Sequence, residues 1–248
     1  MTALLSVQNV TVRFGGLVAV DGASFDVERG TILGLIGPNG AGKTTLFNAI
    51  NGVYSRHAGS ILFDGARISG LRPYEVARRG VARAHQVVRP LNDLSVIANA
   101  TVGAAFGRED LSLGAARKVA EETLASLGLA DKAELLANKL NIAQKKRLEL
   151  ARALAARPRL LLADEVLAGL NPQEVTDMLR VFRDLRTQGV TVVMIEHLMH
   201  AVMNACDRVV VLDYGRKIAE GSPQEVTNDP KVIAAYLGDP KLAEGMSS

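Results

Sequence analysis

Gly37-Pro38-Asn39-Gly40-Ala41-Gly42-Lys43-Thr44-Thr45 decides the fold, because it matches the phosphate-binding pattern G-x-x-x-x-G-K-[ST] at every fixed position. Apolar residues 32–36 precede this loop and residues 46–50 follow it, so its context is strand, glycine-rich turn and helix. The glycines let backbone N–H groups face phosphate oxygens, and the helix N-terminus favours an anion. The complete pattern and its flanks disfavour the alternative, a glycine-rich turn that merely ends in Lys-Thr.

The loop therefore predicts a site for a nucleoside triphosphate. Lys43 is placed for the β- and γ-phosphates, and the hydroxyl of Thr44 can bind Mg²⁺. The nucleotide contacts that we expect from the loop are Asn39, Gly40, Ala41, Gly42, Lys43, Thr44 and Thr45.

The composition is that of a globular protein with little sign of nucleic-acid binding. The chain has 248 residues, a net charge of +3, 48% hydrophobic residues and 22% charged residues. No block of five like charges occurs, so we expect Arg78-Arg79 and Lys145-Lys146-Arg147 to be solvated and no nucleic acid to bind. The single cysteine, Cys206, excludes an internal disulfide and a Cys-based zinc site, and we expect a buried thiol.

The sequence also lacks the segments that carry a chain into or across a membrane. No run of eighteen apolar residues is present, and residues 1–6 do not form a secretion signal. If the protein works at a membrane, we expect another chain to provide the membrane span.

The order of strand and helix patterns predicts an α/β fold with a P-loop NTPase core. Short β-rich pieces at residues 4–30 predict an antiparallel edge, and residues 74–79 predict a helix. Apolar strands separated by helices such as 173–187 predict a mostly parallel sheet covered on both faces. The expected strands of this sheet are 32–36, 160–164, 191–195 and 208–212.

Between about 91 and 155 the strand patterns disappear, and apolar residues recur at helical spacing. We therefore predict one domain over residues 1–248. Its nucleotide-binding core would comprise residues 1–90 and 156–248, with a helical subdomain inserted at 91–155.

A second group of polar residues lies where the predicted strands end. Asp164 and Glu165 follow the strand 160–163, where Asp164 can hold a Mg²⁺-bound water and Glu165 can act as general base. His197 ends another strand and could orient Glu165 and the water, although a lone histidine is more often a satisfied core or surface residue. Gln86 stands at the junction with the helical segment and could bind Mg²⁺. For His57, His85 and His200 we predict no role.

In this order along the chain, these residues resemble the ATPase subunit of ATP-binding cassette (ABC) transporters over nearly the whole sequence. The chain looks most like the importers of branched-chain amino acids, through residues 13–20, 168–172, 195–197, 219–226, 228–230 and 235–238. The resemblance implies that Phe14 stacks on adenine, that Val20 packs beside it, and that Gln86 lies in the lid loop. It also implies that Glu165 is the catalytic base and that His197 is the switch histidine.

The sequence departs from the family pattern in three places. Leu140-Asn141-Ile142-Ala143-Gln144 stands where most members have Leu-Ser-Gly-Gly-Gln. We call Asn141, Ile142, Ala143 and Gln144 the signature-like segment; the resemblance implies that it reaches the ATP of a partner subunit. Val166 replaces the usual proline, and Asn171 replaces the usual aspartate.

The resemblance implies an ATP-hydrolysing subunit, with ATP and Mg²⁺, that energises an importer of branched-chain or other amino acids. Its partners would be a second ATPase subunit and membrane-spanning permease subunits and, indirectly, a periplasmic or extracellular substrate-binding protein. It would lie peripherally on the cytoplasmic face of the inner membrane. Two alternatives stay open: a soluble regulatory ABC ATPase without a membrane partner, and a catalytically weak subunit of an asymmetric pair.

Overall fold

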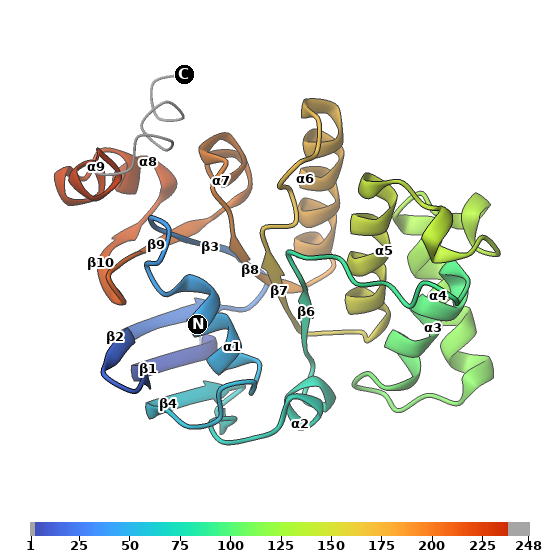
Figure 1. The fold of residues 1–248 in the computed structure, drawn as a ribbon, viewed down its shortest axis with the longest axis horizontal. Helices are drawn as coiled ribbons and strands as arrows, with labels where there is room; N and C mark the ends of the chain where they lie inside the picture. The colour runs from blue at the N-terminus through green and yellow to red at the C-terminus, as the bar shows by residue number, and fades with distance from the viewer. Residues whose placement is uncertain (1–2, 238–248) are drawn as a thin grey trace.

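Six strands form the sheet that carries the phosphate-binding loop. The computed structural model describes residues 3–237. The strand order is β10-β9-β3-β8-β7-β6, and all neighbours are parallel except β10 and β9, which pair antiparallel (Figure 1). The strands are β3 (Ile32–Ile36), β6 (Val81–Ala84), β7 (Leu160–Asp164), β8 (Thr191–Ile195), β9 (Arg208–Asp213) and β10 (Arg216–Gly221).

The sheet is buried on both faces because its central strands β3, β7 and β8 are apolar at nearly every position, apart from Asp164 and Thr191 at strand ends. In β3, Leu33 and Leu35 pack into one apolar cluster, while Ile32 and Ile36 pack into another on the opposite face. This alternation is the two-residue period of a strand. The predicted parallel, doubly covered sheet is therefore confirmed.

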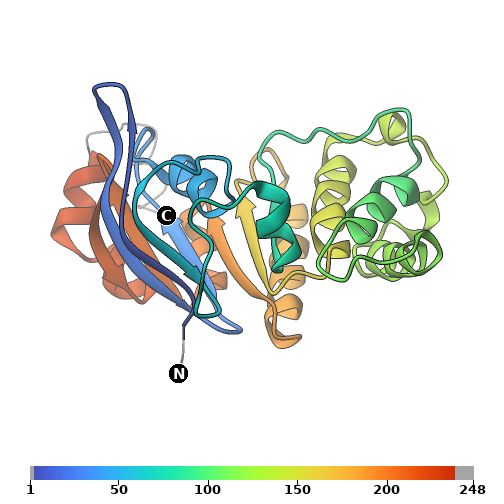
Figure 2. The same cartoon turned by 90° about the horizontal axis from the view of Figure 1, so that it is seen from below.

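The N-terminal strands are antiparallel as predicted, but they form a sheet of their own. Its order is β2-β1-β4-β5, and Figure 2 shows the long β1–β2 hairpin crossing beside the main sheet. The short strand pieces expected before residue 30 are parts of only two strands, since β-bulges bend each strand without ending it. The strands are β1 (Ala3–Phe14), β2 (Leu17–Glu28), β4 (Ala58–Phe63) and β5 (Ala66–Arg67).

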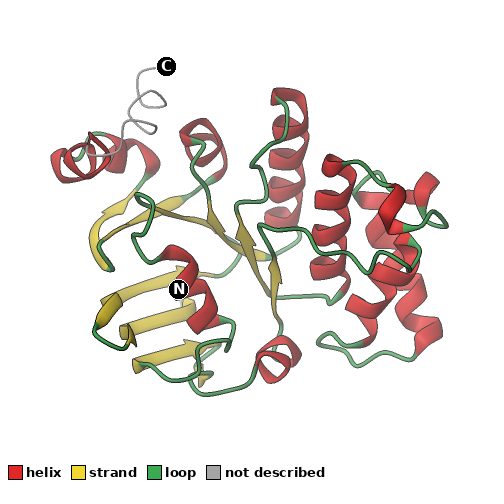
Figure 3. Cartoon of the chain, in the orientation of Figure 1, coloured by secondary structure: helices red, strands yellow, loops and turns green. Residues whose placement is uncertain are grey.

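Helices cover both faces and one end of the main sheet (Figure 3). Helix α1 packs between the two sheets, in the same apolar cluster as β1 and β2. Among the described residues, no helix combines the length and apolar character needed to cross a membrane. The helices are α1 (Lys43–Ile50), α2 (Pro73–Arg78), α3 (Val96–Ala105), α4 (Leu113–Ser126), α5 (Ile142–Ala155), α6 (Pro172–Thr187), α7 (Met199–Ala205), α8 (Pro223–Thr227) and α9 (Pro230–Leu237), with short 3₁₀ turns at Ala130–Lys132 and Ala137–Lys139.

Helices α3, α4 and α5 lie together beyond strand β6, and no strand is found among them (Figure 1). Most of their buried apolar side chains belong to the same cluster as one face of the main sheet, as Leu148 and Leu161 illustrate, while a smaller cluster around Ala116 lies among the three helices. The division into a core and an inserted subdomain at 91–155 stays a prediction. Residues 238–248, at the end of the predicted core, lie outside the described part of the chain.

Cys206 is buried, as the sequence predicts. Its Sγ lies 3.5 Å from Sδ of Met194, and burial raises the pKa of the thiol to about 12. A thiol in this environment is inert at neutral pH.

Candidate functional site

Strand register brings the segments that follow β3, β6, β7 and β8 to one edge of the main sheet. They carry the phosphate-binding loop, Gln86, Glu165 and His197. Ile195 pairs with Leu35 on one side and with Asp164 on the other. Ala84 pairs with Ala163, so Gln86 follows a strand that ends beside Asp164. All these strands are parallel, so their carboxyl ends meet where the phosphate-binding loop begins.

The loop is pressed against neighbouring backbone at two glycines. A Cβ on Gly37 would lie 2.0 Å from the carbonyl oxygen of Leu212, and a Cβ on Gly42 would lie 2.3 Å from that of Ala19. Their φ angles are 146° and 95°, in the region that favours glycine. Helix α1 then begins at Lys43 without a side-chain cap, so the N–H groups of its first turn are available to an anion.

The Lys43 ammonium is buried within the loop. Its Nζ donates to the carbonyl oxygens of Gly37 (2.6 Å) and Pro38 (2.9 Å). Burial lowers the pKa of Lys43, and the carboxylates of Glu165 and Asp164 oppose that shift. The Lys43 ammonium thus places a positive charge where the phosphate groups of a nucleotide would bring negative charge.

Asp164 combines a buried ion pair with an unused oxygen. Its Oδ2 accepts from Arg83 at 2.5 Å, and Arg83 also donates to Oδ1 of Asn48 at 2.6 Å. Asp164 is only 2% exposed, and its Oδ1 has no hydrogen-bond partner. A buried carboxylate oxygen without a donor is a suitable ligand for a hard cation such as Mg²⁺.

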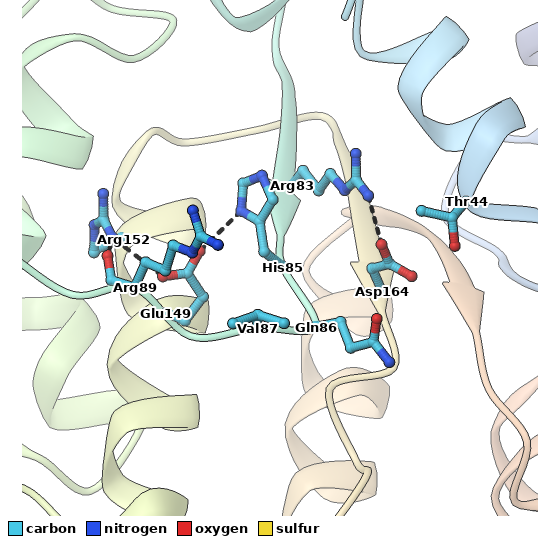
Figure 4. Close-up of a pocket in the computed structure, with 9 residues that line it drawn as sticks. All are labelled: Thr44, Arg83, His85, Gln86, Val87, Arg89, Glu149, Arg152 and Asp164. Carbon is cyan, nitrogen blue, oxygen red and sulfur yellow. Dashed lines mark hydrogen bonds and ion pairs between the residues drawn. The ribbon is translucent and has the colours of Figure 1, made fainter.

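Thr44 and Asp164 border the same pocket of about 440 Å³, whose lining side chains Figure 4 shows. The pocket opens between the end of α1 that carries the loop and helix α5. It is lined by Thr44, Arg83, His85, Gln86, Val87, Arg89, Glu149, Arg152 and Asp164.

Two side chains from other elements hold the carboxylate of Glu165. Gln86 Nε2 donates to Oε2 at 2.5 Å, and His197 Nε2 lies 2.9 Å from Oε1. Glu165 itself has a φ of 47°, an uncommon backbone conformation for a residue with a side chain. Three residues that are far apart in the sequence and that the sequence nominates for catalysis therefore meet in one place.

The two residues expected near adenine differ in accessibility. Phe14, at the end of β1, is 45% exposed and packs edge-on against Tyr54 with ring centroids 5.1 Å apart. Val20 is fully buried and lies against Gly42, below the loop. The ring of Phe14 is therefore partly exposed at the end of β1, whereas Val20 is buried against the loop in this structure.

The signature-like segment forms the N-terminus of helix α5. The side-chain oxygen of Asn141 accepts the N–H of Gln144 at 2.8 Å, and Gln144 Oε1 accepts the N–H of Asn141 at 3.1 Å. This reciprocal capping box uses the acceptor groups of both side chains. Ile142 is 68% exposed, so the tip of α5 presents an apolar side chain to its surroundings.

Several residues of the site were missed by the sequence analysis. Lys146 was expected in solvent but is buried, and His85 was given no role but binds Glu149 at 2.9 Å. The available signal for Lys146 was helical spacing, since Leu150 and Ala153 follow it by four and seven residues and are buried on the same side of α5. Arg83, the partner of Asp164, carried no pattern that could have identified it.

Asn171, which departs from the family pattern, has a clear local role. Its side-chain oxygen accepts the N–H of Glu174 at 2.9 Å and caps helix α6. Asparagine and aspartate are equally good N-caps, so this replacement conserves the start of the helix.

Comparison with known protein families shows to which family the chain belongs. The model described as ABC transporter matches residues 20–168, which include the phosphate-binding loop, Gln86 and Glu165. The chain belongs to the ATP-binding proteins of ABC transporters. A second model, described as branched-chain amino acid ATP-binding cassette transporter, matches residues 216–245.

Relatives and solved structures agree with this family. The chain is 39% identical to the high-affinity branched-chain amino acid transport ATP-binding protein BraF of Pseudomonas aeruginosa, over 95% of this chain and 98% of that protein. It is 37% identical to LivG of Escherichia coli over the same shares of the two chains. A nucleotide-free ATP-binding cassette superimposes with a TM-score of 0.87 at 30% identity, over 96% of this chain and all of that one. The protein is thus an ABC ATPase coupled to transport.

Replacing Lys43 by methionine should weaken ATP binding by roughly tenfold or more, because a charge-assisted hydrogen bond contributes about 1.5–3 kcal/mol. The chain should remain folded with a loss of stability of at most about 1–3 kcal/mol, because the variant leaves the carbonyl oxygens of Gly37 and Pro38 without this donor. Titration with a fluorescent ATP analogue and a thermal melt measure the two effects. Lys145→Met is the matched control, and equal affinity in both variants would remove Lys43 from the nucleotide site.

The buried carboxyl group of Glu196 should make the stability of the fold depend on pH. Burial raises the pKa of Glu196 to about 7, partly opposed by the N–H of Leu167 and by Lys146. The unfolded carboxyl titrates near its ordinary value, so ionisation of Glu196 penalises the folded state as pH rises from about 4.5 to 7. Glu196→Gln should therefore gain stability relative to wild type between pH 5 and pH 8. Urea unfolding at both pH values tests this, and a variant-to-wild-type difference that is the same at both would contradict it.

Proposed function

We propose that this chain hydrolyses ATP at Glu165 to drive the import of branched-chain amino acids. The observation that carries the proposal is the carboxylate of Glu165, held by Gln86 and His197 at the edge of the phosphate-binding loop. A general base needs a fixed position beside its water, and two hydrogen-bonding neighbours provide this.

Each group at the site has a separate task in this proposal. The N–H groups of residues 40–45 and the Lys43 ammonium bind the β- and γ-phosphates and stabilise charge on them. Glu165 takes a proton from the attacking water, and His197 and Gln86 keep its carboxylate oriented. Phe14 offers its exposed ring to the purine.

Asp164, Thr44 and Gln86 would hold Mg²⁺. The residues fit this ion, since Asp164 Oδ1 is a buried oxygen without a donor and Thr44 borders the same pocket. Bound there with phosphate oxygens, Mg²⁺ would neutralise part of their charge. Arg83 keeps the other oxygen of Asp164 in place, which limits the aspartate to one direction of binding.

The likeness to BraF and LivG supports the substrate and partners. Those proteins are named for branched-chain amino acid transport, and the family model for that group matches residues 216–245 of this chain. We infer that two ATPase subunits close around two ATP molecules and move permease subunits docked near Gln86. The chain would then lie on the cytoplasmic face of the membrane.

The signature-like segment favours an unlike second subunit. The capping box uses the side-chain acceptors of Asn141 and Gln144, and the Cβ atoms of Ile142 and Ala143 restrict the approach of a phosphate to the backbone. A pair of identical chains would therefore have two weak sites. A second ATPase with glycines at these positions would complete the site built on Lys43 and Glu165.

Replacing Glu165 by glutamine should lower ATP hydrolysis by about a hundredfold or more, which is the usual contribution of a positioned base. ATP binding should persist, because glutamine keeps the shape and cannot accept the proton. Phosphate release and nucleotide affinity are measured on the full chain, with the exposed Glu134→Gln as control. Undiminished hydrolysis in Glu165→Gln would overturn the proposed mechanism.

Replacing Ala143 by glycine tests the pairing proposal. If the methyl group limits phosphate approach, the variant should gain about fivefold in the ATPase rate of the isolated chain, corresponding to one hydrogen bond of about 1 kcal/mol. Lys145→Gly is the control for the loss of helix propensity alone. An isolated wild-type chain with a full ATPase rate that Ala143→Gly leaves unchanged would exclude the need for an unlike partner.

A further inference from the structure

Helix α5 carries a buried lysine, Lys146, whose side-chain hydrogen bonds all go to residues outside this helix. Lys146 is 8% exposed, and its Nζ donates to the carbonyl oxygens of Val166 (3.2 Å), Glu165 (3.5 Å) and Ala168. A buried ammonium costs stability unless its donors are satisfied, and here three carbonyl groups of one loop satisfy them. Lys146 thereby fixes the backbone that follows Glu165.

A buried carboxylate reinforces the same loop from the other side. Glu196 is 2% exposed, and its Oε1 accepts the N–H of Leu167 at 3.0 Å. Burial lowers the pKa of Lys146, while the carboxylates of Glu196 and Glu165 raise it, so opposite charges flank the loop. The segment 165–168 is therefore bound through its carbonyl groups to α5 and through an N–H group to the residue before His197.

The same face of α5 also holds the segment that leads to Gln86. Glu149 stands one turn after Lys146 and binds His85 at 2.9 Å through Oε1. Its other oxygen accepts from Arg152 at 3.1 Å, and Arg152 donates to the carbonyl oxygen of Arg89 at 3.1 Å. Gln86 in turn donates to the side chain of Glu165. Helix α5 is therefore linked to Glu165 twice, directly through Lys146 and indirectly through Glu149 and the segment that carries Gln86.

We propose that Lys146 is a positioning residue for hydrolysis, which ties the backbone of Glu165 to the helix that begins with the signature-like segment. When the tip of α5 engages the ATP of a partner subunit, the ammonium transmits the position of that helix to the chain's own Glu165. The hydrogen bonds of Lys146 reach neither the phosphate-binding loop nor Phe14, the residue proposed to contact the purine. It therefore acts on the rate of the chemical step and not on nucleotide binding. This inference rests on the proposed role of Glu165.

The test is a graded series at position 146 in the full chain, assembled with its permease subunits. Lys146→Met removes every donor, Lys146→Gln keeps an amide donor on a shorter side chain, and Lys146→Arg keeps a charged donor. We expect kcat to fall roughly tenfold in Lys146→Met, less in Lys146→Gln and least in Lys146→Arg, since misplacing a reacting group by about 1 Å costs up to about a hundredfold. KM and the affinity for ATP should stay within about twofold of wild type, a difference below 0.5 kcal/mol.

Lys145→Met, one residue away on the same helix, is the matched control and should behave as wild type. A thermal melt of each variant gives the folded fraction, and the rates are normalised to it. If Lys146→Met is not recovered folded, the comparison of Lys146→Gln with Lys146→Arg decides in the same way. Equal normalised kcat across the series, or a loss of ATP affinity parallel to that of kcat, overturns the inference. An inactive wild-type transporter would instead refute the proposed function on which the inference rests.

Discussion

The register of the buried parallel strands is the constraint on which the site depends. Because β3, β8 and β7 pair in register, Leu35, Ile195 and Asp164 lie at one level of the sheet. A slip of one residue would turn every side chain of a strand to the opposite face and expose its apolar set. The two apolar clusters that cover the sheet thus also place the phosphate-binding loop, Asp164 and His197 side by side.

Helix α5 connects this edge to the rest of the molecule. Its apolar side packs against the sheet and helices α3 and α4, while Lys146 and Glu149 bind the loops that follow β7 and β6. The exposed tip of the helix carries the signature-like segment. One helix therefore reaches both the proposed partner-facing surface and Glu165, the proposed catalytic base, and this arrangement suits an enzyme whose two subunits act together.

Local sequence patterns predicted the strands and the loop because their physical causes are local. The strands 160–164 and 191–195 were predicted with their observed bounds, since continuous apolar runs between polar segments specify buried strands. The phosphate-binding loop could be predicted as well, because its backbone needs glycine at fixed positions. Gly37 and Gly42 lie so close to neighbouring backbone that no other residue fits there. Gln86, Glu165 and His197 were nominated from their places at strand ends, and the structure brings them together.

The remaining features depend on bonding partners that lie on distant segments, and no local pattern identifies those partners. Lys146 belongs to a run of basic residues that reads as solvated, yet the fold of the loop after β7 places three carbonyl groups around it. Arg83 and Glu196 are likewise explained only by partners far along the chain. The antiparallel N-terminal strands were predicted, but their separation from the main sheet was not, because it depends on the pairing of β1 with β4, which lies far along the chain.

Amide hydrogen exchange of the full chain with its second subunit, with and without a non-hydrolysable ATP analogue, tests the central claim most directly. We expect slower exchange of the N–H groups of residues 40–45 whenever the analogue binds, because phosphate oxygens accept from them. We also expect slower exchange at residues 142 and 143, but only at concentrations at which the two subunits pair. Nucleotide binding that leaves exchange of residues 40–45 unchanged would contradict the assignment of this loop as the phosphate site.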